Sequence, residues 1–244
     1  MPLIPPFENW YLRAAGLRRV AGALRLPPEV FAALLAAPHD PSPDFVVPTR
    51  WRRREADHPR YARFCYALAR ATRARRVLEV GSSSGGTSSG WARALGEAAR
   101  EGEDVELVCV DNDSYAAGVY PAITAHNVAR AGLPSERVTY LCGDSAVALP
   151  GLRERYGGHF DICLVDGDHT FEGATTDLEN ALPLVRPGGL IAVHDVDPGR
   201  AMAEATPAHP APVYDALTAF ASRHALPFCI LRFIRKHLAI VRVG

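Results

Sequence analysis

The 244-residue sequence has no surplus of charge of either sign, because 27 lysine and arginine residues balance 27 aspartate and glutamate residues. A protein whose main partner is nucleic acid needs a basic surplus to bind phosphates, so we expect no such partner. No apolar run approaches the ~20 residues of a membrane-spanning helix. Pro2, Pro5 and Pro6 interrupt any stretch that could act as a signal peptide. We therefore expect a cytoplasmic protein that binds no membrane.

The sequence also lacks the paired cysteines of a disulfide framework or a structural zinc site. Its five cysteines are scattered, none belongs to a CxxC pair, and most lie in apolar, strand-like segments. This distribution predicts reduced thiols packed in a protein core.

Short apolar segments alternate with helical patterns from about residue 75 onward. The expected strands are Arg76–Val80, Val105–Asp111, Val138–Cys142, Phe160–Asp166, Leu190–His194, Phe228–Phe233 and His237–Val243. The expected helices are Thr87–Glu101, Tyr115–Ala131, Ser145–Tyr156, Glu172–Val185 and Ala211–His224. Continuously apolar strands in this rhythm predict a Rossmann-like, doubly wound α/β fold with seven mostly parallel strands and helices on both faces. The short connection at Ile234–Lys236 predicts a hairpin, so the last strand should be antiparallel.

The first 72 residues have a different pattern. Helical periodicity occurs at Trp10–Leu24, Pro28–Ala37 and about His58–Arg73, and a proline-rich loop is expected at Pro38–Pro48. We predict an N-terminal helical extension over residues 1–72, followed by the main domain over residues 73–244. The core fold does not need the aromatic residues of this region, so we expect the extension to form part of an acceptor site or of a homodimer contact. These aromatic residues are Phe7, Trp10, Tyr11 and Trp51.

A glycine-rich turn follows the first expected strand. Gly81 and Gly85 allow a tight turn and a close backbone approach to a ligand beside the start of the next helix. The spacing differs from the GxGxxG of pyrophosphate binders, and no lysine stands beside a serine or threonine as in a P-loop. The turn is therefore a candidate site for another nucleotide-like ligand, with a purely structural strand–helix turn as the alternative.

Acidic residues end the next two expected strands. Asp111, with Asp113 in reserve, is placed to accept hydrogen bonds from both hydroxyls of a ribose, and Asp144 is placed to meet an adenine amino group. Each acid could instead cap a helix, an alternative that applies above all to Asp144. Their recurrence at successive strand ends favours a ligand site.

Together with Asp166 and the run Arg186–Gly189, these motifs resemble class I methyltransferases over about residues 75–244. The resemblance implies S-adenosylmethionine (SAM) as the cofactor, its methionine part held by the glycine-rich turn and its ribose by the acid after the second strand. The residues expected to bind the cofactor are Glu79, Gly81, Ser83, Gly85, Thr87, Asp111, Asp144 and Asp166.

Two further segments, Leu164–Glu172 and Ile191–Val196, end adjacent strands of the expected sheet. They resemble the bacterial small-molecule methyltransferases related to macrolide-sugar O-methyltransferases and cephalosporin-hydroxylase-like proteins. The resemblance implies a divalent metal, often Mg²⁺, on Asp166, His194 and Asp195. These relatives usually carry an acid or Asn where this chain has His194 or Asp195, and a histidine ligand favours softer ions such as Mn²⁺, Fe²⁺ or Zn²⁺. The alternative is a structural histidine and no metal.

His169 is the best candidate for a general base. A hydroxyl must lose its proton to accept a methyl group, and imidazole titrates near neutrality. We therefore expect methylation of a hydroxyl on a small natural-product molecule such as a sugar or phenol. The open alternatives are N- or C-methylation without a metal, a nucleotide-binding oxidoreductase, and a non-catalytic cofactor-binding protein. The segment Val196–Pro212 is a candidate lid over the acceptor.

Overall fold

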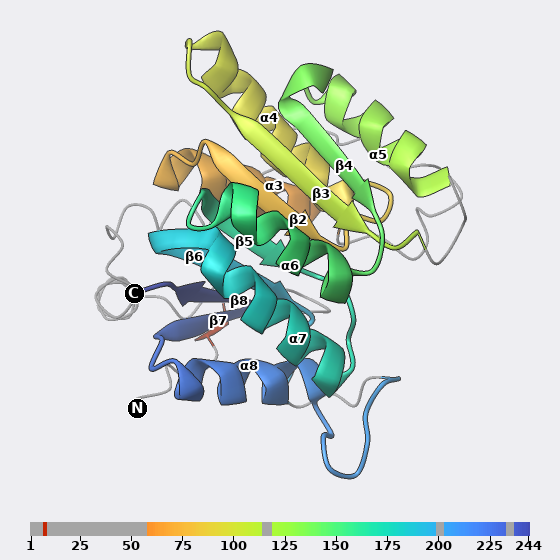
Figure 1. Ribbon diagram of the computed structural model, residues 1–244, viewed down its shortest axis with the longest axis vertical. Coiled ribbons are helices and arrows are strands. Elements are labelled where there is room, and N and C mark those ends of the chain that lie inside the picture. The colour runs from red at the N-terminus through yellow and green to blue at the C-terminus, as the bar shows by residue number, and fades with distance from the viewer. Residues whose placement is uncertain (1–6, 9–57, 114–118, 199–202, 233–236) are drawn as a thin grey trace. The chain divides into compact units, whose positions relative to one another are not determined.

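The structure is a computed structural model that describes residues 7–8, 58–113, 119–198, 203–232 and 237–244 (Figure 1). The chain forms two compact units, one from residues 1–28 and 145–244 and the other from residues 29–144. The helices expected at 10–24 and 28–37, the loop at 38–48 and the hairpin turn at 234–236 lie outside the described residues.

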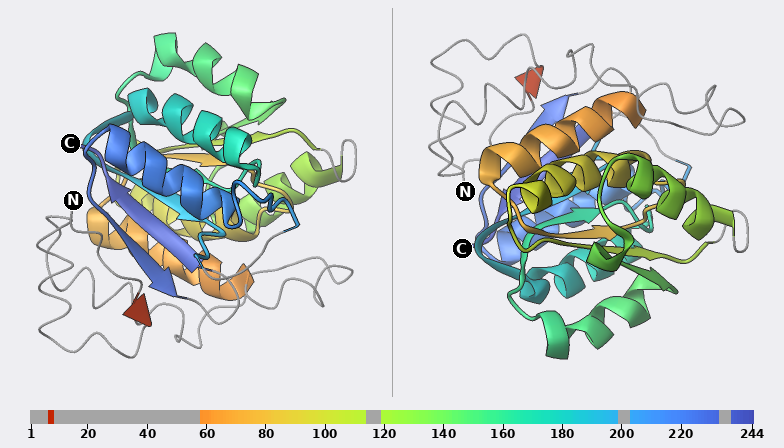
Figure 2. Two further views of the ribbon diagram at one scale, coloured as in Figure 1. Left: turned by 90° about the horizontal axis from the view of Figure 1, so that it is seen from below. Right: turned by 90° about the horizontal axis from the view of Figure 1, so that it is seen from above.

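In the described part of residues 29–144, three parallel strands run in the order β2-β3-β4. They are β2 (Arg76–Val80), β3 (Glu106–Asp111) and β4 (Val138–Cys142), with a 3-10 turn at Ser135–Arg137 before β4. The helices are α3 (His58–Thr72), α4 (Gly86–Arg100) and α5 (Val119–Arg130). Helix α4 packs against both α3 and α5 on one face of the strands (Figure 2). The apolar residues of β2 and β3 are buried, as continuous apolar strands predict.

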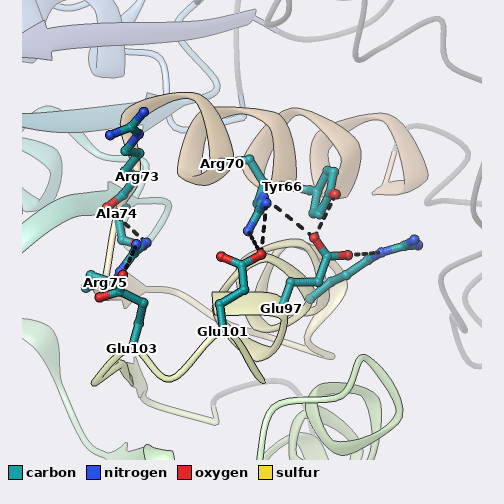
Figure 3. Close-up of polar contacts among 9 residues, drawn as sticks. Tyr66, Arg70, Arg73, Ala74, Arg75, Glu97, Glu101 and Glu103 are labelled. Atoms are coloured by element: carbon teal, nitrogen blue, oxygen red, sulfur yellow. Dashed lines mark hydrogen bonds and ion pairs between the residues drawn. The ribbon is translucent and has the colours of Figure 1, made fainter. Parts of the chain in front are cut away.

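Helices α3 and α4 are joined by polar contacts around Glu97 (Figure 3). The Tyr66 hydroxyl donates to Glu97 Oε2 at 2.9 Å, while Arg70 Nε lies 3.6 Å and Arg93 Nε 3.4 Å from the same carboxylate. Burial and the neighbouring Glu97 carboxylate raise the pKa of Tyr66, so its hydroxyl keeps its proton and remains a donor. The network lies beside a close backbone contact, because a Cβ added to Gly90 of α4 would overlap the carbonyl of Ala62 in α3.

Replacing Gly90 with alanine should therefore destabilise the protein, although alanine is the better helix former. The overlap is with backbone, so α3 and α4 must separate, and overpacking of this kind costs about 1–3 kcal/mol. The measurement is urea unfolding. The control is Gly151→Ala, because a Cβ at Gly151 meets nothing within 4 Å. A Gly90→Ala variant as stable as the control would contradict the close packing of α3 on α4.

The residues of the other unit that the structure describes form five strands in the order β1-β7-β8-β6-β5. They are β1 (Phe7–Glu8), β5 (Phe160–Val165), β6 (Val185–His194), β7 (Phe228–Arg232) and β8 (His237–Arg242). Strand β8 runs antiparallel to both β6 and β7, while β5 is parallel to β6 and β1 is parallel to β7. The helices α6 (Ser145–Tyr156), α7 (Phe171–Ala181) and α8 (Pro212–Arg223) lie side by side (Figure 2, left).

The strands β2 to β8 confirm the predicted Rossmann-like α/β class, with mostly parallel strands and a reversed last strand. The helix expected over Glu172–Val185 is shorter than predicted. It ends at Ala181, and a 3-10 turn at Leu182–Leu184 contains Pro183, which has no amide to continue the helical ladder. Strand β6 begins at Val185, before the predicted Leu190, and its pairing with β5 shifts register at the Pro-Gly-Gly segment. The edge strand β1 was not predicted.

Cysteine placement follows the prediction for four of the five thiols. Cys65, Cys109, Cys163 and Cys229 are buried, whereas Cys142 is exposed at the end of β4, and none forms a disulfide. Among the described residues, no helix is both long and apolar enough to cross a membrane.

Candidate functional site

The glycine-rich turn between β2 and α4 is built on left-handed backbone conformations. Gly81, Ser83 and Gly85 have φ values of 83°, 44° and 78°. The Gly81 amide donates to the Val110 carbonyl at 2.8 Å, which ties the turn to the end of β3. A Cβ on Gly85 would lie 2.9 Å from the Thr124 Cα of α5, so a side chain would be excluded here by both space and conformation. The sequence prediction of a tight turn at these glycines is confirmed.

Helix α5 holds the turn from its other side. The Thr124 hydroxyl donates to the Ser83 carbonyl at 2.6 Å, and the Asn127 side-chain amide donates to the Ser84 carbonyl at 2.8 Å. Thr124 and Asn127 are both buried. The protein's own contacts thus hold the turn in this conformation. Sequence analysis missed these two residues, although polar side chains three positions apart in a packed helix were the available signal.

Glu79 and Thr87, both predicted cofactor contacts, bond to one another beneath the turn. The fully buried Glu79 carboxylate accepts hydrogen bonds from the hydroxyls of Thr87 and Ser88, which lie in the first turn of α4. Burial and the charge of Glu79 raise the pKa of the neighbouring Cys109 thiol. The geometry makes Glu79 and Thr87 positioning residues that fasten α4 to β2, since their polar atoms are already engaged with each other.

Asp111 is the last residue of β3, at the strand end where the sequence predicted a ribose-binding acid. Its Oδ2 accepts from the Ser83 amide and its Oδ1 from the Asp113 amide, both at 2.7 Å. The side chain is partly exposed, and each carboxylate oxygen has a further lone pair for a ligand hydroxyl. The structure therefore brings together Gly81, Ser83, Gly85 and Asp111. Asp144 is exposed just beyond the neighbouring strand β4.

Replacing Asp111 with alanine should weaken binding of S-adenosylhomocysteine (SAH), the demethylated cofactor, by about 1.5–3 kcal/mol, the range for a hydrogen bond to a charged group. Isothermal calorimetry measures this loss. Asp104→Ala is the control, because Asp104 is an exposed acid of the same unit that pairs with Arg76. Equal SAH affinity in the Asp111→Ala and Asp104→Ala variants would remove Asp111 from the cofactor site.

The second predicted site is a cluster of two acids and two histidines in the unit of residues 145–244. Asp166 follows β5, His194 ends β6, and these strands are adjacent and parallel, with Val165 paired to Val193. One ligand atom from each of Asp166, His169, His194 and Asp195 lies within 4.8 Å of all the others. The predicted metal ligands and the predicted base are therefore brought to a single point.

Short contacts connect the cluster. Asp166 Oδ1 lies 3.2 Å from His169 Nε2 and 3.0 Å from His194 Nδ1. Asp195 lies 3.4 Å from His169 and 3.2 Å from His194. Burial alone would raise the pKa of Asp166, but the two histidines lower it well below its usual range, so the carboxylate is ionised. Asp166, also a predicted cofactor contact, directs one carboxylate oxygen at both imidazoles.

The cluster fits a divalent cation. Two carboxylates and two imidazoles are a common ligand set, and ligands bonded at about 2.0–2.2 Å to one ion lie roughly 3–4 Å apart. The histidine-to-carboxylate separations of 3.0–3.4 Å match that spacing, and all four ligand atoms lie within 4.8 Å of one another. Asp195 also has a φ of 57°, and a strained conformation of this kind in a non-glycine residue is typical of functional sites. Asp166, His194 and Asp195 would hold the ion, and His169 is close enough to be either its fourth ligand or a base.

The fold and the two sets of strand-end residues are those expected of a class I methyltransferase domain. Residues 78–196 match the sequence profile of a family described as a methyltransferase domain. The match includes the glycine-rich turn and ends one residue after Asp195.

Among characterised proteins, the chain is 32% identical over 138 residues to a catechol O-methyltransferase from Niastella koreensis. A catechol O-methyltransferase from Mycobacterium tuberculosis is 33% identical over 134 residues. The first alignment covers 57% of this chain and 57% of that relative, so the chain matches little more than half the length of the curated relatives.

Solved structures extend the similarity to more of the chain. The cofactor-bound structure of Rv0187 from MTB is 25% identical, with a TM-score of 0.61 over 88% of this chain and 89% of that one. The O-methyltransferase TomG from Streptomyces achromogenes, solved with SAM, is 24% identical with a TM-score of 0.60 over the same shares. These similarities confirm the fold class.

Proposed function

We propose that this protein is a SAM-dependent methyltransferase that methylates a hydroxyl group of a small molecule with help from a divalent metal. The observation that carries the proposal is the four-residue cluster of Asp166, His169, His194 and Asp195, since its donors fit a cation and its histidines can take up a proton. Similarity to catechol O-methyltransferases supports transfer to oxygen.

In this proposal the glycine-rich turn binds SAM. The left-handed residues Gly81, Ser83 and Gly85 bring the backbone close to the ligand, while Asp111 accepts hydrogen bonds from the ribose hydroxyls. Thr124, Asn127 and Glu79 hold this arrangement in place, so little conformational entropy is lost when the cofactor binds.

SAM would supply an electrophilic methyl group on sulfur, and a divalent ion held by Asp166, His194 and Asp195 would lower the pKa of the acceptor hydroxyl and orient it. His169 Nε2 faces the Asp166 and Asp195 carboxylates and donates to them, so Nδ1 is the ring nitrogen that would accept the proton the hydroxyl loses as the sulfur–methyl bond breaks and the oxygen–methyl bond forms. Asp166 and Asp195, at 3.2 Å and 3.4 Å from His169 Nε2, stabilise the imidazolium that results. The products are the methyl ether, SAH and the proton held by His169.

The acceptor class is a phenol or a sugar hydroxyl of a natural product. The relatives named catechol O-methyltransferases favour the phenol. Residues 1–72 are proposed to contribute to the acceptor site or to a homodimer contact, since the methyltransferase match begins only at residue 78. Transfer to nitrogen or carbon without a metal is the second candidate, but it assigns no function to the cluster of Asp166, His169, His194 and Asp195.

Calorimetry on the purified full chain tests both halves of the proposal. We expect SAH to bind at one site per chain, Mn²⁺ or Mg²⁺ to bind separately, and NAD not to bind. Binding of NAD without SAH would contradict the methyltransferase and favour an oxidoreductase. A protein that binds SAH but binds no divalent ion would favour a metal-free transferase.

A further inference from the structure

The loop that carries Asp166 and His169 is tied to the first turn of α7. Thr170 caps this helix, because its hydroxyl accepts from the Gly173 amide at 3.0 Å. Asp168 Oδ1 in turn accepts from the Thr170 amide at 2.8 Å. Only two residues separate Asp166 from His169, so the conformation at Asp168 determines whether both side chains reach the same ion.

Gly173 leaves room for Asp168. A Cβ added to Gly173 would overlap the Cβ, Cγ and Oδ2 atoms of the Asp168 side chain. The Asp168 side chain is short and its Cβ is fixed by the backbone, so rotation alone cannot relieve the overlap. Any side chain at position 173 must therefore displace the loop between Asp166 and His169.

Asp177 of α7 contacts the backbone of the same loop. It lies one helical turn beyond Gly173 on α7, is only 1% exposed, and its Oδ2 accepts from the Asp168 amide at 3.4 Å. A carboxylate at this depth is costly to bury unless it is bonded. Helix α7 thus meets Asp168 twice, at its side chain through Gly173 and at its backbone through Asp177.

We infer that Gly173 and Asp177 are positioning residues for the metal cluster, which hold Asp168 so that His169 stays within reach of Asp166 and Asp195. The inference rests on the proposed function, because it assigns these residues to the metal site. Partners that orient metal ligands typically change metal affinity by about 10–100-fold when they are mutated. Neither residue belongs to the four-residue cluster, so both would act through the geometry of the loop.

The test measures Mn²⁺ affinity by calorimetry and electron paramagnetic resonance in Gly173→Ala, Asp177→Ala and Asp177→Asn. SAH affinity and thermal stability are measured on the same samples. Gly151→Ala is the matched control, a helical glycine of the same unit with open space around its Cβ. We expect Mn²⁺ binding to weaken about 10–100-fold in Gly173→Ala and Asp177→Ala, with SAH affinity unchanged. Asp177→Asn should bind Mn²⁺ more tightly than Asp177→Ala, because its side-chain oxygen can still accept from the Asp168 amide.

Wild-type Mn²⁺ affinity in both Gly173→Ala and Asp177→Ala would overturn the inference and leave the proposed function intact. Equal loss of Mn²⁺ and SAH affinity in all three variants would indicate a general loss of structure and would also overturn it. A wild-type protein that binds SAH but no divalent ion would contradict the metal in the proposed function and this inference with it.

Discussion

Replacing Asp166 or Asp195 with alanine is expected to abolish divalent-metal binding and all chelator-sensitive methyl transfer. Asp166 Oδ1 contacts both histidines of the cluster, and Asp195 contacts the same two imidazoles from the end of β6. Loss of either carboxylate removes a ligand and leaves neighbouring imidazoles without the negative charge that they face. SAH affinity should remain near that of the wild type, because the ion serves the acceptor.

The control for these variants is Asp161→Ala. Asp161 lies near the other end of β5, pairs with the exposed Arg186 at 2.6 Å, and is not part of the cluster. Activity assays with added Mn²⁺ or Mg²⁺, run beside metal-binding calorimetry, give the result. Full metal-dependent activity in Asp166→Ala would refute the assignment of this cluster.

Replacing His169 with alanine should lower turnover by about 10²–10⁴-fold, the usual range for loss of a general base. The imidazole lies in the cluster beside two carboxylates that would stabilise its protonated form. Cofactor binding does not involve the proton that His169 would take from the acceptor, so SAH affinity should hardly change. Turnover under saturating acceptor and SAM is the quantity to measure.

His224→Ala provides the comparison, since His224 of the same unit contacts Glu179 at 2.8 Å and is not part of the cluster. Metal affinity measured on the His169→Ala protein separates two roles. Lower turnover with unchanged metal affinity identifies a base, whereas a parallel loss of metal affinity identifies a fourth ligand. Turnover equal to that of His224→Ala would exclude both roles.

The fold could be predicted because its signals are local. Buried parallel strands such as Phe160–Val165 are apolar on both faces, and the helices between them show regular periodicity. The edge strand Phe7–Glu8 could not be predicted, since two residues have no periodicity and this strand depends on its pairing with β7. The early start of β6 was missed because Pro187 and Gly188 imply a turn, whereas the pairing shifts register there.

The residues of the candidate site that lie at strand ends could be predicted from the sequence. Asp111, Asp166, His194 and Asp195 all lie at or just after the carboxyl end of a strand, so the topology alone brings the last three together. The contacts that hold those residues depend on tertiary packing. The spacing of Thr124 and Asn127 indicates a pair of polar side chains on one helix face, but it does not give their bonds to the turn, and no spacing indicates the exclusion of a side chain at Gly173.

Glu79 shows the limit of a motif. Its position before the glycine-rich turn implied a cofactor contact, but its carboxylate is fully buried and accepts from Thr87 and Ser88. A motif gives the residue type at a position, and the direction of the side chain depends on the helix that packs against it.

The most direct test of metal-assisted O-methylation is a mass-spectrometric assay of the full chain with SAM and a panel of phenols and sugars, each with and without chelator. We predict that at least one hydroxylated acceptor gains one methyl group, that chelator stops the reaction, and that added divalent metal restores it. Methylation only of amine or carbon acceptors, at a rate that chelator does not alter, would contradict the account.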